Sequence, residues 1–492
     1  MQKFSKIVLT TFMGQAPDWY KYSVLGALIL NPFILLAVGP FITGWIILIE
    51  FIVTLAMALK CYPLLPGGLL AVQTVFMGLA TPEVIYKETL ANFPVILLLM
   101  FMVAGIYFMK DFLAFTFTKI LFSTRSKMLL SLMFLIAGAV LSAWLDALTV
   151  IAVIIAVSVA FFQIYNSASY EERVPGIADE AAREQTGRED LENFRGFLRN
   201  LLMHAAVGTA LGGVSTLVGE PQNLLIGNVM GWNFPDFFFK MLHVSLPVFV
   251  AGLFTCILTE QFKVFGFGFQ LPERVRLVLK SQADEDTKKR TSSDVFKLWI
   301  MGIGAIWLVI ALALHLAEVG LIGLSVIIFL TAFTGKADEH QIGKAFEEAL
   351  PFTALLVVFF GIVGMIHNLH LFTPISDWAL SFKGQDQLNA FFIASAVLSA
   401  ISDNVFVATI YITEAQKAFT SGIIDRAQFE QLAIAINVGT NIPSVATPNG
   451  QAAFLFLLTS AIASKIHLSY FEMLKLAFPY TVILSLAAYY FL

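Results

Sequence analysis

Long apolar runs, separated by short charged or glycine-containing breaks, recur along the whole chain. Many approach twenty residues, the length that a helix needs to cross the hydrocarbon core of a membrane. The runs are continuously apolar and do not alternate with a period of two, so they predict transmembrane helices and exclude a barrel of strands. We expect a broken span near residues 431–464 and spans near residues 23–41, 43–60, 63–81, 93–122, 201–230, 237–261, 297–316, 318–335, 350–381 and 472–491.

Two further apolar stretches, near 126–165 and 388–419, each carry an aspartate in the middle and predict helical hairpins. They read Leu141-Ser-Ala-Trp-Leu-Asp146-Ala-Leu-Thr149-Val and Leu398-Ser-Ala-Ile-Ser-Asp403-Asn404-Val-Phe-Val407. A carboxylate at membrane depth costs about 2.5–3.5 kcal/mol on insertion scales, so it usually has a function. The alternative is that each aspartate caps a helix where its hairpin turns.

The similarity of the two hairpins extends to their surroundings and predicts an internal duplication. Val207-Gly208-Thr209 matches Val438-Gly439-Thr440, and the run from Asn92 resembles the run from Leu350. Acids in matching positions of two halves are typical of transporters built from inverted repeats, with the ion site at the repeat interface. We therefore expect an all-α polytopic membrane protein of about eleven transmembrane helices plus two re-entrant hairpins. The expected parts are 1–42 (first span), 43–261 (first repeat), 262–296 (linker) and 297–492 (inverted second repeat).

Lysine and arginine in the loops predict the orientation in the membrane. The basic residues of 262–297 and 166–199 place both segments in the cytoplasm, whereas 420–430 contains only Arg426. The N-terminus is then cytoplasmic and the C-terminus periplasmic. No short apolar segment with a cleavage site precedes the first span, so we expect no cleaved signal peptide.

Composition agrees with a membrane protein and excludes other classes. The 492 residues are 58% hydrophobic and 13% charged, with a net charge of −4, which leaves no footprint for nucleic acid. Membrane lipid is the expected environment. Cys61 and Cys256 fall in or beside spans and are expected to be small apolar fillers.

Each hairpin is followed by a span that is rich in glycine, proline and small polar residues. Such residues interrupt a helix and free carbonyl oxygens, which at membrane depth is tolerated only inside protein or beside a water-filled cavity. Free carbonyls and small side chains offer the hard oxygen ligands that suit Na⁺ or Li⁺. The same glycines could equally serve close helix packing. The expected ion-binding residues are Asp146, Asp403, Asn404, Ser142, Ser399, Thr149, Gly212, Thr216, Thr440, Asn441, Ser444 and Thr447.

Glu220 breaks the match between the two halves. Aligning Pro221 with Pro448 places Glu220 opposite Thr447, so only the first half has a titratable group there. We expect Glu220, with Asp146 and Asp403, to couple transport to protons. His204, near the start of the same span, is expected to be an interfacial histidine and not a proton relay.

At these motifs the chain resembles the NhaB-type bacterial sodium/proton antiporters. The resemblance covers Gln15-Ala-Pro-Asp-Trp-Tyr-Lys, Met57-Ala-Leu-Lys-Cys-Tyr-Pro, both hairpins, Glu220-Pro-Gln-Asn and Ser444-Val-Ala-Thr-Pro-Asn-Gly-Gln. More distantly, Asp403-Asn404 is similar to the Ser-Asn pair at the hairpin tips of sodium-coupled dicarboxylate carriers, whereas the first tip reads Asp146-Ala147. The resemblance implies a homodimer in the bacterial inner membrane, with a scaffold part and a moving transport part.

The chemistry favours exchange of Na⁺, or Li⁺, for H⁺ by alternating access. Burial disfavours the charged form of a carboxylate and a bound cation favours it, so one ion displaces the other. No cofactor is expected beyond these ions. The alternative is a sodium-coupled symporter of small carboxylates, but neither tip nor broken span contains a lysine or arginine to bind an anion. An enzyme is not expected, because no nucleophile with its base and no metal motif is present.

Overall fold

The computed structural model describes residues 10–168 and 180–492 of the chain. Within these ranges every regular element is a helix, which confirms the prediction of an all-α protein. The predicted first part, 1–42, and the charged segment 166–199 lie partly outside the described residues.

The N-terminal half contains thirteen elements in the described ranges, including one short π-helical segment. They are α2 (Asp18–Ala56), α3 (Leu64–Phe76), α4 (Pro82–Ala91), α5 (Phe93–Leu97), η1 (Leu98–Met102), α6 (Val103–Tyr107), α7 (Lys110–Ser123), α8 (Lys127–Ser142), α9 (Ala147–Ser167), α11 (Glu180–Gly213), α12 (Pro221–Met230), α13 (Phe234–Phe262) and α14 (Glu273–Lys289).

The C-terminal half is likewise built from helices in the described part of the chain. They are α15 (Ser292–Ala313), α16 (Val319–Thr334), α17 (Glu339–Asn368), α18 (Thr373–Leu380), α19 (Gln385–Ser399), α20 (Asn404–Thr420), α21 (Arg426–Asn441), η2 (Pro443–Ala446), α22 (Ala452–Thr459), α23 (Ala461–Lys465) and α24 (Tyr470–Phe491).

Length and composition qualify six of the described helices as membrane spans, or seven if the bent pair of Pro82–Ala91 and Phe93–Tyr107 is counted as one. Shorter apolar helices, among them α3, α8 and α16, add to this set. Helix α2 contains a break at Gly39, whose φ of 80° is accessible to glycine at little cost, so its range joins two helices. The chain is thus a helical membrane protein in which several apolar helices are short or broken.

Two charged segments are more ordered than expected. Helix α14 lies within 262–296, and α11 already begins at Glu180 inside 166–199. Charged residues form a helix in water where opposite charges lie four positions apart, as Glu285 and Lys289 do at 3.4 Å in α14. The predicted span 93–122 is also wrong as a single helix, because α5, η1, α6 and α7 divide it.

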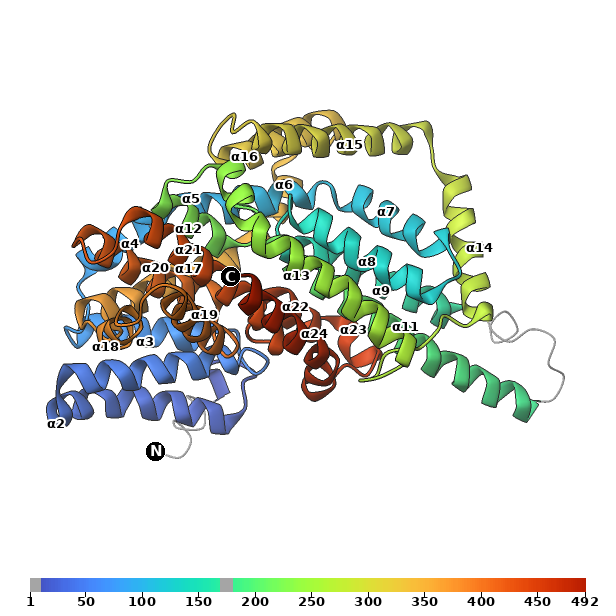
Figure 1. Cartoon of the computed structure of the whole chain (residues 1–492). Coiled ribbons are helices and arrows are strands. Elements are labelled where there is room, and N and C mark those ends of the chain that lie inside the picture. Colours follow the sequence, from blue (N-terminus) through green and yellow to red (C-terminus); the bar gives the residue numbers. More distant parts are fainter. Residues whose placement is uncertain (1–9, 169–179) are drawn as a thin grey trace.

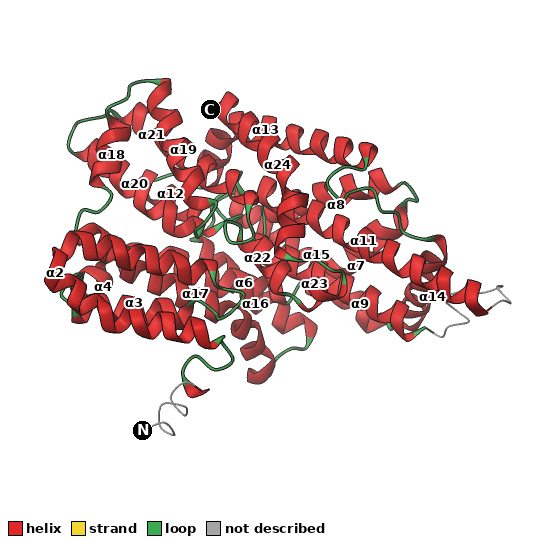
Figure 2. Ribbon diagram, turned by 90° about the horizontal axis from the view of Figure 1, so that it is seen from below, coloured by secondary structure: helices red, strands yellow, loops and turns green. Residues whose placement is uncertain are grey.

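The helices around the two breaks pack in a reciprocal way. Helix α8 packs on α11, and α19 packs on α21. The two broken spans then cross over, since α12 of the first half contacts α20 and α22 of the second half contacts α9 (Figure 1). The view from below shows the same division, with α8, α9 and α11 apart from α18, α19 and α20 (Figure 2). The crossing brings both breaks to the middle of the molecule.

Glycines allow this close packing of helix pairs. A Cβ atom on Gly212 would lie 1.9 Å from the carbonyl oxygen of Ala139, and one on Gly208 would lie 2.2 Å from that of Leu135. In the second half, a Cβ on Gly439 would lie 2.8 Å from the carbonyl oxygen of Phe392. These contacts show that the three glycines serve close helix packing.

Candidate functional site

Both hairpin aspartates cap the helix that follows them. Asp146 Oδ2 accepts hydrogen bonds from the Thr149 backbone N–H at 3.2 Å and from its hydroxyl at 3.4 Å. Asp403 Oδ1 accepts from the backbone N–H groups of Val405 and Phe406 at 2.8 and 3.3 Å. The alternative role as a helix cap is therefore real, and it fixes where each carboxylate points.

The same two carboxylates line one small cavity together with Glu220. The cavity has a volume of about 10 Å³, which is room for a single water molecule or a bare monovalent cation. Asp146 is 1% exposed and Glu220 is 4% exposed, whereas Asp403 is half-buried. The described residues that line the cavity are Asp146, Leu148, Glu220, Pro221, Gln222, Phe352, Asp403, Asn404, Val405, Gly450 and Ala452.

A threonine side chain connects each helix break to the neighbouring hairpin by a hydrogen bond. Thr216 donates its hydroxyl hydrogen bond to the Ala143 carbonyl at 2.6 Å and accepts from Gly219 N–H at 3.2 Å. Thr447 donates to the Ala400 carbonyl at 2.5 Å and accepts from Gly450 N–H at 3.2 Å. The two breaks thus share one local structure, a Thr-x-x-Gly turn held against a hairpin.

These contacts define how the two halves correspond. Thr216 and Thr447 are 231 residues apart (447 − 216), and so are Gly219 and Gly450 (450 − 219). Glu220 therefore corresponds to Gln451, and the prediction that it corresponds to Thr447 is wrong. The error came from aligning the prolines, which are 227 residues apart (448 − 221) and occupy different places in the turn.

Glu220 and Gln451 are isosteric groups in this shared turn. Glu220 is buried and its Oε1 forms no hydrogen bond of ordinary geometry with the described residues. Gln451 is fully buried, faces Glu220, and neither polar atom of its side chain completes such a bond there. Buried polar groups are normally paired, so the Oε1 atom of Glu220 has capacity for a ligand.

Amide side chains join the two broken spans behind the cavity. Gln222 Nε2 donates to Asn441 Oδ1 at 2.9 Å, and Asn441 Nδ2 donates to Asn223 Oδ1 at 3.1 Å. Asn437 Nδ2 donates to the Val214 carbonyl at 3.3 Å. These bonds connect α12 with α21 and hold the two breaks at a fixed separation.

The second half binds its own small polar residues internally. Ser399 donates to the Thr440 carbonyl at 2.7 Å and is hydrogen-bonded to Asn404, whose Nδ2 donates to Ser444 Oγ at 3.4 Å. In the first half, the buried hydroxyl of Ser142 has no hydrogen-bond partner among the described residues. The hairpins are alike in backbone but differ in side-chain bonding.

The structure thus brings together only some of the predicted site residues. Asp146, Asp403, Asn404 and Glu220 line the cavity. The others lie behind it, in the helices and turns that support it: Ser142, Ser399, Thr149, Gly212, Thr216, Thr440, Asn441, Ser444 and Thr447. Sequence analysis missed Gln451, Gln222 and Phe352. A match of Thr216-x-x-Gly-Glu to Thr447-x-x-Gly-Gln would have identified Gln451.

An acidic cavity between two broken spans, in an all-helical apolar chain, is the architecture of a secondary transporter. The chain matches the family model for bacterial Na⁺/H⁺ antiporter B (NhaB) over residues 1–491, and it belongs to that family.

Relatives named Na⁺/H⁺ antiporter NhaB are similar along nearly their whole length. The chain is 57% identical to that of Vibrio atlanticus over 482 residues, which cover 97% of this chain and 91% of the relative. It is 58% identical to that of Marinobacter nauticus over 478 residues, covering 96% and 95%. It is 57% identical to that of Pseudomonas entomophila over 478 residues, covering 96% of each.

Proposed function

We propose that this protein exchanges Na⁺, and Li⁺, for H⁺ across the bacterial inner membrane by alternating access. The observation that carries the proposal is the meeting of Asp146, Asp403 and Glu220 at one buried cavity. A buried carboxylate is stable either protonated or paired with a cation, and is costly when bare. Na⁺ and H⁺ therefore compete for the same groups, and the empty charged site crosses the membrane poorly.

The proposed roles follow the position of each residue. Asp146, Asp403 and Asn404 contact the ion, and Asp146, Asp403 and Glu220 carry the protons. The remaining predicted ligands offer backbone and hydroxyl oxygens as the breaks move: Ser142, Ser399, Thr149, Gly212, Thr216, Thr440, Asn441, Ser444 and Thr447. Gln451 is added to the site as the neutral partner of Glu220.

The reciprocal packing supports two inverted repeats, 43–261 and 297–492, each with a re-entrant hairpin. The hairpins are α8 with α9 and α19 with α20, and about eleven spans surround them. The basic segment 262–296 favours a cytoplasmic linker, a cytoplasmic N-terminus and a periplasmic C-terminus. The resemblance to known antiporters supports a homodimer, which mass measurement of the purified protein in detergent tests.

Symport of small carboxylates is the less favoured function. No basic side chain occurs among the described residues that line the cavity, and three acidic ones do. Three carboxylates repel an anionic substrate, and a volume of about 10 Å³ admits one bare cation but not a dicarboxylate.

Proteoliposomes with an internal pH-sensitive dye test the proposal. Addition of Na⁺ alone outside should move protons, and addition of a small carboxylate should have no further effect. Liposomes that carry the Asp146→Asn, Asp403→Asn double variant serve as the control for leak. Proton movement that requires the carboxylate would replace exchange by symport.

A further inference from the structure

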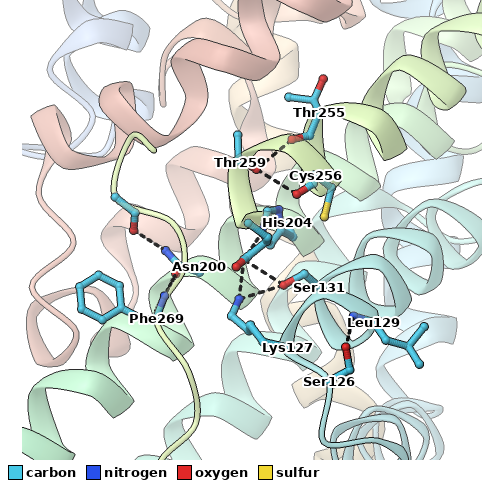
Figure 3. A network of polar contacts seen from close by, with 12 residues as sticks. Ser126, Lys127, Leu129, Ser131, Asn200, His204, Thr255, Cys256, Thr259 and Phe269 are labelled. Atoms are coloured by element: carbon cyan, nitrogen blue, oxygen red, sulfur yellow. Dashed lines mark hydrogen bonds and ion pairs between the residues drawn. The ribbon is translucent and has the colours of Figure 1, made fainter. Parts of the chain in front are cut away.

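Figure 3 shows a second network of polar contacts, around Lys127 and His204, neither of which lines the transport cavity. Glu260 of α13 is its centre. Lys127, the first residue of α8, places Nζ 2.5 Å from Glu260 Oε1, and His204 of α11 places Nε2 2.7 Å from the same oxygen. The side chains of Lys127, Glu260 and His204 are 10%, 2% and 0% exposed. The His204 ring is fully enclosed by protein and hydrogen-bonded on both nitrogens.

The cluster continues on the far side of the histidine. His204 Nδ1 lies 2.7 Å from the Tyr480 hydroxyl of α24, which in turn faces Cys256 and Thr259 of α13. Ser131 of α8 donates to Glu260 Oε1 at 3.0 Å. The other oxygen, Glu260 Oε2, has no hydrogen-bond partner in the described part of the chain. Four helices thus meet around a single carboxylate.

A polar cavity of about 560 Å³ connects the front of this cluster to the surface. Lys127 and Glu260 form part of its wall, beside Arg125, Lys263 and Arg276. Glu273 also lines it. His204 lies behind Lys127 and Glu260, so the cavity gives water and protons access to the cluster from the side that carries the basic linker 262–296.

One carboxylate stands between two groups that can each carry a positive charge. With His204 neutral, Lys127 and Glu260 form a buried pair of zero net charge. A proton on His204 would place a second positive charge beside the same oxygen and give the buried cluster a net charge of +1. A buried charge without a partner is strongly unfavourable. Of the two cationic groups, only Lys127 can move its charge into the cavity, because it lines the cavity and its side chain is long and flexible.

The hydrogen bonds around the ring permit this change. In the neutral form, Nε2–H donates to Glu260 and Nδ1 accepts from Tyr480 O–H. In the protonated ring both nitrogens donate, Nε2–H to Glu260 and Nδ1–H to the Tyr480 oxygen, and Tyr480 O–H turns toward Thr259 or Cys256. No bond to carbon forms or breaks, and the only species taken up is one proton.

We propose that His204 is a proton-binding site separate from the transport cavity, and that proton uptake there moves Lys127 from Glu260 into the polar cavity. Helix α8 then loses its ion pair to α13. Helix α8 is the first helix of the hairpin whose tip carries Asp146. The site therefore controls the first hairpin. At the positions that correspond to Lys127 and His204, the second half has Gly384 (384 − 127 = 257) and Ala435 (435 − 204 = 231).

Amine labelling of the purified full chain tests the movement directly. The readout is the ratio of labelling at Lys127 to labelling at Lys263, an exposed lysine of the same cavity, by mass spectrometry. Lowering the pH from about 8 to about 5, the range in which histidines titrate in proteins, should raise this ratio several-fold in the wild type. In His204→Gln the ratio should not change with pH, and in Glu260→Gln it should be high throughout.

His367→Gln is the matched control, because His367 Nδ1 lies 2.8 Å from Glu88 Oε1 in a histidine–glutamate pair that is more exposed than that of His204. It should behave like the wild type. A wild-type ratio that stays constant with pH would overturn the proposal, and so would a His204→Gln ratio that follows the wild type.

The effect on transport rests on the proposed exchange function and is measured separately. In proteoliposomes at saturating Na⁺, His204→Gln should reduce the difference in exchange rate that we expect the wild type to show between about pH 6 and pH 8. An equal loss of rate at every pH would make His204 a purely structural residue and contradict the proposal. Absence of exchange in the wild type would refute the proposed function but leave the labelling result valid.

Discussion

The two helix breaks have the same backbone design and different chemistry. Each uses a threonine and a glycine to hold a turn against a hairpin that carries an aspartate. The next position is Glu220 in the first half and Gln451 in the second, so one turn can titrate and the other cannot. Side-chain bonding differs as well, because Asn404 joins Ser399 in the second hairpin where the first has Ala147 and an unbonded Ser142. A symmetric scaffold thus supports an asymmetric site.

The largest expected effect is on the groups that the two halves share. Asp146→Asn and Asp403→Asn should each reduce Na⁺-driven proton movement to near background, because asparagine keeps the helix cap but cannot exchange a proton for Na⁺. The rate in proteoliposomes is the measurement. Asp425→Asn is the control, since Asp425 caps α21 at an exposed position. Loss in only one of the two variants would show that the halves contribute unequally, and normal exchange in both would exclude these aspartates as carriers.

The next effect concerns the group that the halves do not share. Glu220→Gln gives both turns the same side chain, retains an oxygen ligand and removes titration. It should change the pH dependence of exchange more than the apparent Na⁺ affinity. The matched variant Glu220→Gln, Gln451→Glu moves the acid to the other turn and should restore part of the wild-type pH dependence.

A pH series of exchange rates at several Na⁺ concentrations separates the outcomes. Unchanged pH dependence in Glu220→Gln would make Glu220 a structural acid. A change confined to Na⁺ affinity would make it a ligand. Failure of the exchanged pair to recover any pH dependence would show that the two turns are not interchangeable.

Sequence alone could predict the acids at the centre but not their surroundings. Asp146 and Asp403 stand out because a carboxylate is costly in an apolar run, whereas the amide of Gln451 carries no comparable cost and attracts no notice. Pro221 and Pro448 suggested the wrong correspondence, since proline is accepted at several positions of a turn or first helical turn. Buried ion pairs such as Lys127 with Glu260 join residues 133 positions apart, which no local pattern reveals.

Glycine substitutions test whether the two helix pairs are equally tight. Gly212→Ala should destabilise the protein by about 1–3 kcal/mol, because the new Cβ would lie 1.9 Å from the Ala139 carbonyl oxygen and force α11 away from α8. Gly439→Ala should cost less, because its closest contact would be 2.8 Å. Apparent melting temperatures in detergent measure both. Gly343→Ala, at a position with open space around it, is the control. A lower melting temperature for Gly439→Ala than for Gly212→Ala would reverse the comparison.

The smallest effect addresses the hydrogen bonds that make the two breaks alike. Thr216→Val and Thr447→Val each remove a hydroxyl and leave the Ala143 or Ala400 carbonyl without that donor. Each variant should lose about 1 kcal/mol of stability, because the net contribution of one buried hydrogen bond is of that order. Thr→Ser at the same positions keeps the hydroxyl and should retain most of the stability. Since the two bonds are 2.6 and 2.5 Å long, equal decreases in melting temperature are expected. If Thr→Val lowers the melting temperature in one break only, the two turns have the same geometry but their hydrogen bonds contribute differently to stability. The two halves would then be equivalent in backbone structure only.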